Sequence, residues 1–319
     1  MRIFIIFLFS TFLFADVIDT YRYYGIQKTI KEIEKKLQSE KYWLKKLKNI
    51  DVKYGYFENP TFILFCNKIT RTLQVNLYKK GKLKNLTTFN NVIVGKLGDK
   101  QKEGDLKTPI GNYTLINKIK PSNTFYGPLA FVTSYPNLFD KLNKKNGYGI
   151  WIHGKPLDGE RGDLSKGCIV LNNDEIKHLD TLINYKKTVL EITQNPIYAR
   201  KDDIAKILAL IYKWRDAWRK SDLKKYLAFY SQQTFKRSNG MDFKQFKEYK
   251  KRVFDSKKGQ KIDIYFRNIQ ITPYQNVKNL PIYKVEMYEE YLSPTYVFKG
   301  NKEIYLQKFG NQFKIIVEK

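Results

Sequence analysis

The sequence predicts a multi-domain α+β protein, in which a helical N-terminal arm precedes a mostly-β domain and a C-terminal α+β cone. Three observations predict this class. Helical periodicity comes first, short strands separated by turn residues follow as far as Asn195-Pro196, and beyond Pro196 helices precede strands. The 319 residues suffice for two or three domains. We therefore divide the chain into a leader, an arm, a central domain and a C-terminal domain at residues 1–15, 16–58, 59–195 and 196–319.

The leader has the pattern of a secretory signal peptide. Met1-Arg2 is a short basic start, an apolar run continues to Phe14, and Ala15 is a small residue before Asp16. The run is too short to span a bilayer comfortably, so we expect an exported protein. Because Leu13 is unfavourable three positions before the cleavage point, retention of the leader as an anchor is the alternative.

The chain is strongly basic, with 59 Lys and Arg against 31 Asp and Glu and a formal net charge of +28. Such a charge suits a polyanionic partner. Export argues against nucleic acid, so we predict no nucleic-acid partner and favour the cell wall or a membrane surface. The lysines occur throughout the sequence, and the alternative is that they only solvate the surface.

The arm carries a heptad-like helical pattern over residues 21–49. The pattern places its mostly apolar residues in one stripe along the helix. This stripe has two interpretations: the helix packs on its own domain, or it pairs with a second chain to form a homodimer. The positions recur at alternating steps of three and four, with one acidic interruption: Tyr23, Ile26, Ile30, Ile33, Leu37, Glu40, Leu44 and Leu47.

The central domain is predicted from short strands and the turns between them. A hairpin is expected over residues 61–78, and the segment from Thr108 to Gly111 (T-P-I-G) forms a tight turn before the next strand. The remaining expected elements are a strand over 91–94, an irregular loop over 135–148, a helix over 174–182 capped by Asn172 or Asn173, and a final strand over 187–193.

After Pro196 the pattern changes to helices followed by long alternating strands. An amphipathic helix is expected over residues 203–219, a second from Ser221-Asp222 to Tyr230, and a third over 242–254. Four alternating runs follow and predict a curled antiparallel sheet. The aromatic residues here suit a core better than a catalytic cluster.

The candidate chemistry lies between residues 148 and 173. This stretch holds His153 and Cys168, each one of only two residues of its kind and each next to a glycine. A thiol reacts as the thiolate, a histidine can take its proton, and a backbone carbonyl can orient the imidazole. Gly167 lets a substrate approach, and the Gly167 and Cys168 amides are expected to face a developing oxyanion. The combination favours acyl transfer through a thioester. The alternative is two unrelated core residues.

The second cysteine and the second histidine have ordinary interpretations. Cys66 lies in an apolar strand pattern, so we expect a small core residue and two free thiols. His178 lies in a polar, Lys-rich helix. Because these residues lack the spacing of metal ligands, we predict neither a metal nor a cofactor.

Two separated motifs add a family resemblance. I-H-G at 152–154 and S-K-G-C-I at 165–169 resemble the signature of the L,D-transpeptidase catalytic domain (YkuD-like), and the upstream T-P-x-G turn at 108–111 is similar to that family's. The resemblance covers residues 59–195. Residues 196–319 resemble the cone-shaped domains similar to nuclear transport factor 2, including a helix with two Trp residues followed by S-D-L.

The resemblance implies an enzyme that acts on peptidoglycan stem peptides. Cys168 would attack the carbonyl of the third residue and release the terminal D-Ala, with His153 as the base oriented by the Gly154 carbonyl. Ser165 would support the loop, with its hydroxyl near the thiol. Water as the acyl acceptor gives an L,D-carboxypeptidase that trims tetrapeptides to tripeptides, whereas an amine acceptor gives an L,D-transpeptidase.

The sequence departs from the family pattern at two positions. Lys166 stands where a histidine is common, and Val170 where an arginine is common. Both changes disfavour ordinary transpeptidation, because they alter the pocket around the acyl-enzyme. Lys166 or Arg161 could supply the missing positive charge and hold a substrate carboxylate, and the alternative is that both are solvated cations. We add Trp151 and Tyr148 as candidate substrate-binding residues.

The whole layout resembles the cell-shape-determining L,D-carboxypeptidases of helical and curved Gram-negative bacteria. That resemblance implies a periplasmic protein, a dimer formed through residues 21–49, and a C-terminal pocket that binds a ligand or glycan without performing chemistry. We therefore predict an L,D-carboxypeptidase. The alternatives are an L,D-transpeptidase with the same mechanism, and a basic wall-binding scaffold without catalytic activity.

Overall fold

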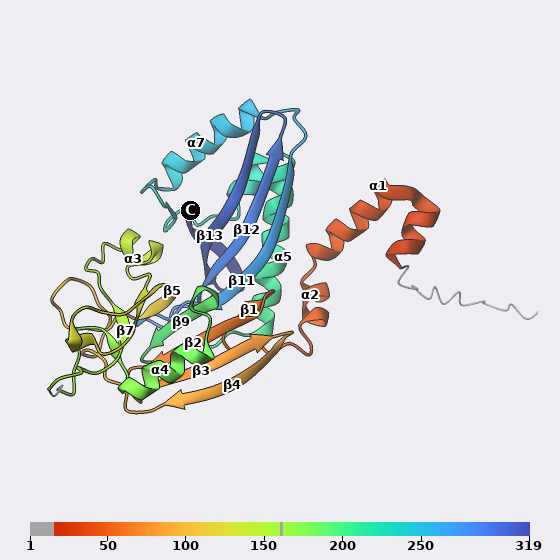
Figure 1. Cartoon of the computed structure of the whole chain (residues 1–319). Coiled ribbons are helices and arrows are strands. Elements are labelled where there is room, and N and C mark those ends of the chain that lie inside the picture. The colour runs from red at the N-terminus through yellow and green to blue at the C-terminus, as the bar shows by residue number, and fades with distance from the viewer. Residues whose placement is uncertain (1–15, 160–161) are drawn as a thin grey trace, which may run out of the picture.

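The fold is built on two β-sheets that belong to different parts of the chain (Figure 1). The computed structural model describes residues 16–159 and 162–319. The predicted signal at 1–15 and the candidate residue Arg161 lie outside these ranges. Among the described residues, no helix combines the length and apolar character needed to cross a membrane.

The central domain contains an eight-stranded sheet with the strand order β4-β3-β2-β9-β5-β6-β7-β8. The predicted hairpin forms as β2 and β3, which pair antiparallel, and β2 also pairs parallel with β9. Helix α4 packs its apolar side on the sheet and begins after Asn172, which resolves the two expected N-caps. The strands are β2 (Thr61–Asn67), β3 (Thr72–Lys79), β4 (Lys82–Phe89), β5 (Gly111–Ile119), β6 (Ala130–Thr133), β7 (Trp151–His153), β8 (Ile169–Val170) and β9 (Thr188–Thr193), and the helices are η1 (Thr124–Tyr126), α3 (Leu138–Leu142), α4 (Asn173–Leu182) and η2 (Tyr185–Lys187).

Two expected elements of this domain differ from the structure. Residues 91–94 do not form a strand, because only Ile93 pairs, through a single bridge to Val170. The segment 135–148 is not wholly irregular, because Asn137 caps the five-residue helix α3. Its side chain accepts a hydrogen bond from the Asp140 amide while the Asp140 carboxylate accepts one from the Asn137 amide.

The C-terminal domain has helices first and a curled sheet after, as predicted. Long strands β11 to β14 form antiparallel neighbours, and the core lies between this sheet and helix α5. The strand order is β1-β11-β12-β13-β14-β10. The elements are α5 (Lys201–Arg219), α6 (Leu223–Leu227), β10 (Lys236–Arg237), α7 (Phe243–Ser256), β11 (Asp263–Pro273), β12 (Ile282–Ser293), β13 (Tyr296–Phe309) and β14 (Gln312–Glu318).

The arm is not the single helix that the heptad pattern predicts, because its helical backbone is broken at Gly25, where φ is +73°, and again at Ser39. Helix α1 (Val17–Leu37) ends before Ser39, whose side chain accepts the Tyr42 amide 3.4 Å away and starts α2 (Glu40–Lys46). Within α2, Trp43 stacks on Tyr212 of α5 with ring centroids 5.7 Å apart. The short strand β1 (Tyr56–Phe57) then joins the edge of the C-terminal sheet beside β11.

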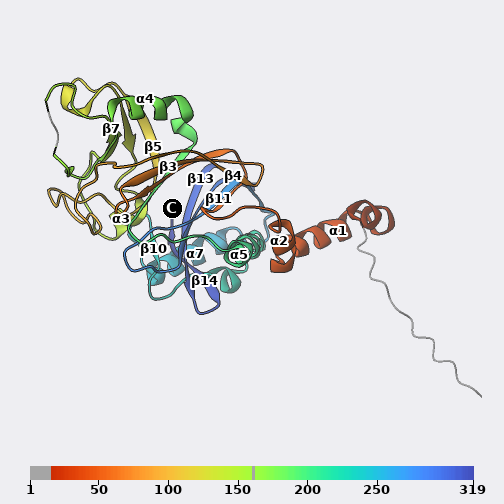
Figure 2. The same cartoon turned by 90° about the horizontal axis from the view of Figure 1, so that it is seen from below.

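The two halves of the heptad pattern therefore have different environments. Leu47 is buried against the C-terminal domain, which fits packing on the arm's own chain. Helix α1 instead projects away from both sheets in Figure 1 and in Figure 2. Its predicted stripe is exposed to solvent at Tyr23, Ile26, Ile30 and Ile33.

Candidate active site

The predicted histidine and cysteine lie on neighbouring parallel strands. Strand β7 pairs with β8 so that Ile152 lies beside Ile169 and His153 beside Val170. Ile152 and Ile169 both enter the core. Because side chains alternate along a strand, His153 and Cys168 belong to the opposite face of the two strands. The Trp151 amide lies 3.5 Å from the Cys168 Sγ, which continues the same register by one residue.

The imidazole of His153 is held by the backbone of the next residue. Its Nδ1 lies 2.7 Å from the Gly154 carbonyl oxygen. Since a carbonyl only accepts, Nδ1 carries the proton and Nε2 is left as the basic nitrogen. The ring is fully buried and meets the Tyr126 ring edge-on, with centroids 5.0 Å apart. This geometry fixes both the tautomer and the ring plane.

The two cysteines have opposite environments, and among the described residues no disulfide joins them. Cys168 is partly exposed, and its Sγ lies 3.5 Å from the Trp151 amide nitrogen and 3.5 Å from the Gly149 carbonyl oxygen. Cys66 is fully buried in β2, and burial raises the pKa of its thiol to about 12. Nucleophilic chemistry at neutral pH therefore suits Cys168 and not Cys66.

Ser165 shapes the turn that presents Cys168. Its hydroxyl donates to the Cys168 carbonyl oxygen at 2.6 Å and accepts the Gly167 amide at 3.1 Å. We expected the Gly167 amide to face an oxyanion, but it is engaged within the turn. The Ser165 hydroxyl is likewise bonded to the carbonyl of Cys168 and not to its sulfur. Both residues thus support the loop.

Gly167 packs against the upstream motif and tolerates no side chain. Its φ is +128°, and a Cβ atom there would lie 2.9 Å from the Lys107 carbonyl oxygen. Behind it, the Gly95 amide donates to the Thr108 hydroxyl at 2.8 Å, and the Ser165 amide donates to the Val94 carbonyl at 3.0 Å. The T-P-I-G segment and the cysteine loop, far apart in the sequence, are therefore packed on one another.

The side chains of the other candidate residues differ in exposure. Trp151 is half-buried and packs on Tyr126 with ring centroids 5.0 Å apart. Tyr148 is 77% exposed, and Lys166 is also exposed. Val170, where an arginine is common, is buried beside His153.

Tyr126 is the residue that sequence reasoning missed. It lies in η1, whose N-cap Asn123 accepts the Phe125 amide, and its ring contacts both Trp151 and His153. The Asn cap and the following Gly127 signal a turn. No spacing rule connects that turn to a histidine 27 positions later.

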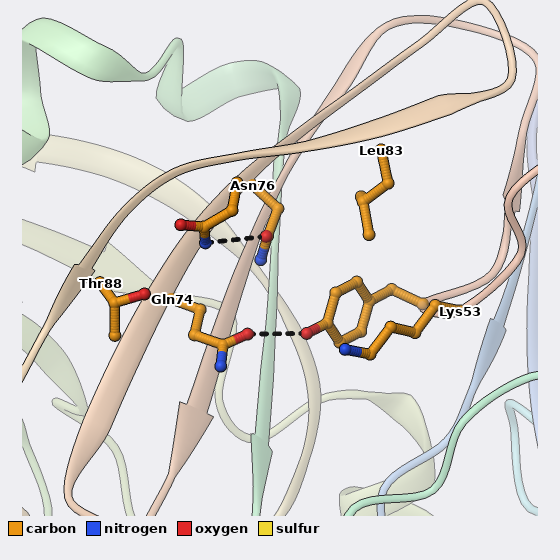
Figure 3. Close-up of a pocket in the computed structure, with 7 residues that line it drawn as sticks. Lys53, Gln74, Asn76, Leu83 and Thr88 are labelled. Carbon is orange, nitrogen blue, oxygen red and sulfur yellow. Dashed lines mark hydrogen bonds between the residues drawn. The ribbon is translucent and has the colours of Figure 1, made fainter.

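A hollow of about 280 Å³ lies elsewhere on the central domain (Figure 3). It opens over β3 and β4, at the opposite end of the strand order from β7 and β8. Its polar groups bond to each other: the Tyr54 hydroxyl donates to Gln74 at 2.8 Å, and the Asn85 amide donates to Asn76 at 3.1 Å. It is therefore separate from the candidate active site.

The interior of the C-terminal cone holds a buried polar cluster. Lys302 forms ion pairs with Glu318 and with Glu289. The Lys250 Nζ lies 4.9 Å from the centroid of the Trp218 ring. Burial lowers the pKa of Lys250 to about 8, although nearby Glu318 opposes the shift.

Both the central domain and the C-terminal domain match known protein families. Residues 62–192 match the L,D-transpeptidase catalytic domain, and residues 206–319 match the Cds6 C-terminal NTF2-like domain. The fold and the site thus define an L,D-transpeptidase-type protein with an NTF2-like domain, and both predicted resemblances are confirmed.

Solved structures narrow the class further. The crystal structure of the helical cell shape determining protein Pgp2 from Campylobacter jejuni superposes with a TM-score of 0.83 at 39% identity, covering 88% of this chain and 99% of that one. The chain therefore belongs to the Pgp2 family. Bd1075 from Bdellovibrio bacteriovorus gives a TM-score of 0.65 at 31% identity, covering 84% and 95%.

A shorter match concerns the catalytic domain. The putative L,D-transpeptidase YafK of Escherichia coli (strain K12) is 33% identical over 86 residues. That segment is 27% of this chain and 31% of YafK, so the match spans about a third of that relative.

Proposed function

We propose that the protein is a peptidoglycan L,D-carboxypeptidase of the periplasm that influences cell shape. The observation that supports the proposal is the pairing of β7 with β8. Its register puts Cys168, a partly exposed thiol, and His153, whose Nδ1 is held by the Gly154 carbonyl, on one face of the two strands. The family match and the Pgp2 likeness support peptidoglycan as the substrate. Export through the predicted signal supports the location.

The mechanism has two acyl-transfer steps. His153 Nε2 takes the Cys168 proton, and the thiolate attacks the carbonyl carbon of the third stem residue. The tetrahedral intermediate collapses, the C–N bond breaks, and D-Ala leaves as an amine that takes the proton from His153. A water molecule then loses a proton to Nε2 and attacks the thioester carbon, which releases the tripeptide carboxylate and returns the thiol.

The molecule that accepts the acyl group from Cys168 decides between hydrolysis and cross-linking. An amine in place of water gives the alternative L,D-transpeptidase. Near Cys168, the buried Val170 stands in place of the common arginine, and the exposed Lys166 in place of the common histidine. The loss of these two side chains supports water as the acceptor.

Mass spectrometry of muropeptides tests the proposal. The full chain with disaccharide-tetrapeptide should give tripeptide and free D-Ala. Cys168→Ala should abolish both products, whereas Cys66→Ala removes the buried thiol and should keep them. Cross-linked dimers in place of tripeptide would establish the transpeptidase. No product from the wild-type chain, with wall pull-down unchanged in Cys168→Ala, would establish the non-catalytic scaffold.

We also propose that the arm mediates a homodimer. The exposed isoleucines on α1 support this, since Ile26, Ile30 and Ile33 follow one another at helical spacing after the backbone break at Gly25.

We further propose that the C-terminal cone binds a ligand or glycan. The buried Lys250 among aromatic rings supports an anionic group on that ligand. Binding of purified peptidoglycan by the full chain should weaken in Lys250→Met. It should not weaken in Lys247→Met, an exposed position of the same helix. Equal binding by both variants would reject the cone as the binding site.

A further inference from the structure

A segment of the C-terminal domain is hydrogen-bonded to the central domain directly beside the T-P-I-G turn. Asn112, the residue after Gly111, is buried. Its amide nitrogen donates to the Pro273 carbonyl at 3.0 Å, and its amide oxygen accepts the Gln275 amide at 2.9 Å. One side chain thus clamps the backbone on both sides of Tyr274.

The Tyr274 side chain is buried between the two domains, where its ring packs on Tyr305 of the C-terminal domain and on Phe139 of α3. It is 1% exposed, and its hydroxyl accepts a hydrogen bond from Asn137 at 3.0 Å and lies 3.5 Å from Asp140 Oδ1. A Cβ atom on Gly111, whose φ is +157°, would lie 2.8 Å from this hydroxyl. The phenol is therefore in contact with both the turn and helix α3.

Asp140 continues this contact toward the cysteine loop. Lys145 bridges Asp140 at 2.8 Å and Asp99 at 2.6 Å, and all three side chains are nearly inaccessible to solvent. Asp99 in turn accepts the Ile110 amide at 2.8 Å. Asp99 lies in the segment 95–111, which packs behind Gly167 as described above.

Lys68, which lies outside the segment 95–111, connects two points of that segment. The Lys68 Nζ donates to the carbonyl oxygens of Gly98 and Thr108, each at 2.6 Å. These contacts form a continuous route from Asp99 and Gly111 to Thr108, and from there to Gly95 and the turn that presents Cys168. Such contiguous packed contacts can carry energetic coupling between distant sites.

We propose that Tyr274 is a positioning residue for Cys168, through which the C-terminal domain sets the conformation of the active-site loop. The inference rests on the proposed role of Cys168 as the nucleophile. Its consequence is that the NTF2-like domain is a structural part of the active site, in addition to any ligand it binds.

The chain offers a matched pair of variants for the test. Tyr305 is also fully buried, and its ring packs on Phe139, as the Tyr274 ring does, and on Tyr274 itself. Its hydroxyl, however, donates to Glu303 within the C-terminal domain. Tyr274→Phe and Tyr305→Phe each remove one buried hydroxyl and keep the ring, but only the first removes a contact with the central domain.

The primary readout is the alkylation rate of Cys168 by iodoacetamide at neutral pH in the full chain, located by peptide mass, beside the thermal midpoint. This readout needs no substrate, so it remains informative even if the wild-type chain releases no D-Ala. We expect Tyr274→Phe to slow alkylation at least about fivefold, the low end of typical coupling, and Tyr305→Phe to stay within about twofold of wild type. Equal rates in the two variants, or faster alkylation in Tyr274→Phe, would overturn the proposal.

A double variant tests the route. If Tyr274 acts through Asp99, then Tyr274→Phe combined with Asp99→Asn should be no slower than the slower single variant. Multiplied effects would show that the two residues act independently, and would overturn the route through Asp99. With active protein, Tyr274→Phe should lower kcat and leave KM unchanged, because Tyr274 is buried away from substrate.

Discussion

Ser165→Ala is the substitution whose effect the site geometry defines most closely. The variant loses the hydroxyl that donates to the Cys168 carbonyl at 2.6 Å and that accepts the Gly167 amide at 3.1 Å. Losing the first bond costs about 1 kcal/mol, and leaving the buried Gly167 amide unpaired costs about 1 kcal/mol or more. We expect the free energy of unfolding to fall by about 2 kcal/mol.

Activity should fall with the order of the turn. If about 1.4 kcal/mol of that loss applies to the reactive conformation of Cys168, D-Ala release slows about tenfold. The assay compares D-Ala release and Cys168 alkylation with urea unfolding. Ser134→Ala is the control, because the Ser134 hydroxyl accepts the Thr114 amide at 3.0 Å, away from the turn. The reasoning is refuted if Ser165→Ala keeps wild-type rates of both release and alkylation.

Three further predictions concern stability and assembly. Burial lowers the pKa of Lys68 from 10.5 to about 8, so between these pH values the unfolded chain binds more protons. The free energy of unfolding should therefore rise with pH between about pH 8 and 10.5, by at most about 3 kcal/mol relative to Lys68→Met. Parallel plots of unfolding free energy against pH for the two proteins would contradict this. Trp43→Ala should cost about 3–5 kcal/mol in chemical denaturation, because it removes the ring stacked on Tyr212. Leu44→Ala at a more exposed position should change little, and an equal loss in both would argue against specific docking of α2. Ile26→Asp should convert a dimer to a monomer in light scattering, whereas Gln27→Asp should not, and a monomeric wild type would reject the arm interface.

The candidate site could be predicted because its chemistry is local in the sequence. His153 and Cys168 are scarce residues beside glycines, and the apolar runs next to them gave two adjacent strands. The carbonyl of Gly154 was available as an orienting group because it is the next residue. The role of the Gly167 amide could not be predicted, because it depends on whether the Ser165 side chain turns toward the loop or toward the sulfur.

Contacts between distant segments could not be predicted from the sequence, for a different reason. Tyr126 approaches His153 only because β6 pairs with β7, and one of many tyrosines has no distinguishing pattern. The aromatic residues after Pro196 were interpreted together as core residues, and sequence periodicity does not say that one of them, Tyr274, also contacts α3 of the neighbouring domain. The break between α1 and α2 did carry a local signal, because Ser39 is a favourable N-cap, but the heptad spacing continued through it.

The early position of α2 and β1 in the chain has a consequence for folding. Their partners are α5 and β11, so a chain emerging from the ribosome has synthesised the whole central domain before either partner exists. Until then Trp43 lacks its stacking partner and the edge of β1 is unpaired. A chain cut short within the C-terminal domain would keep these surfaces open to other chains. The C-terminal domain thus covers α2 and β1, and loss of its sheet should produce aggregation and not an independent catalytic module.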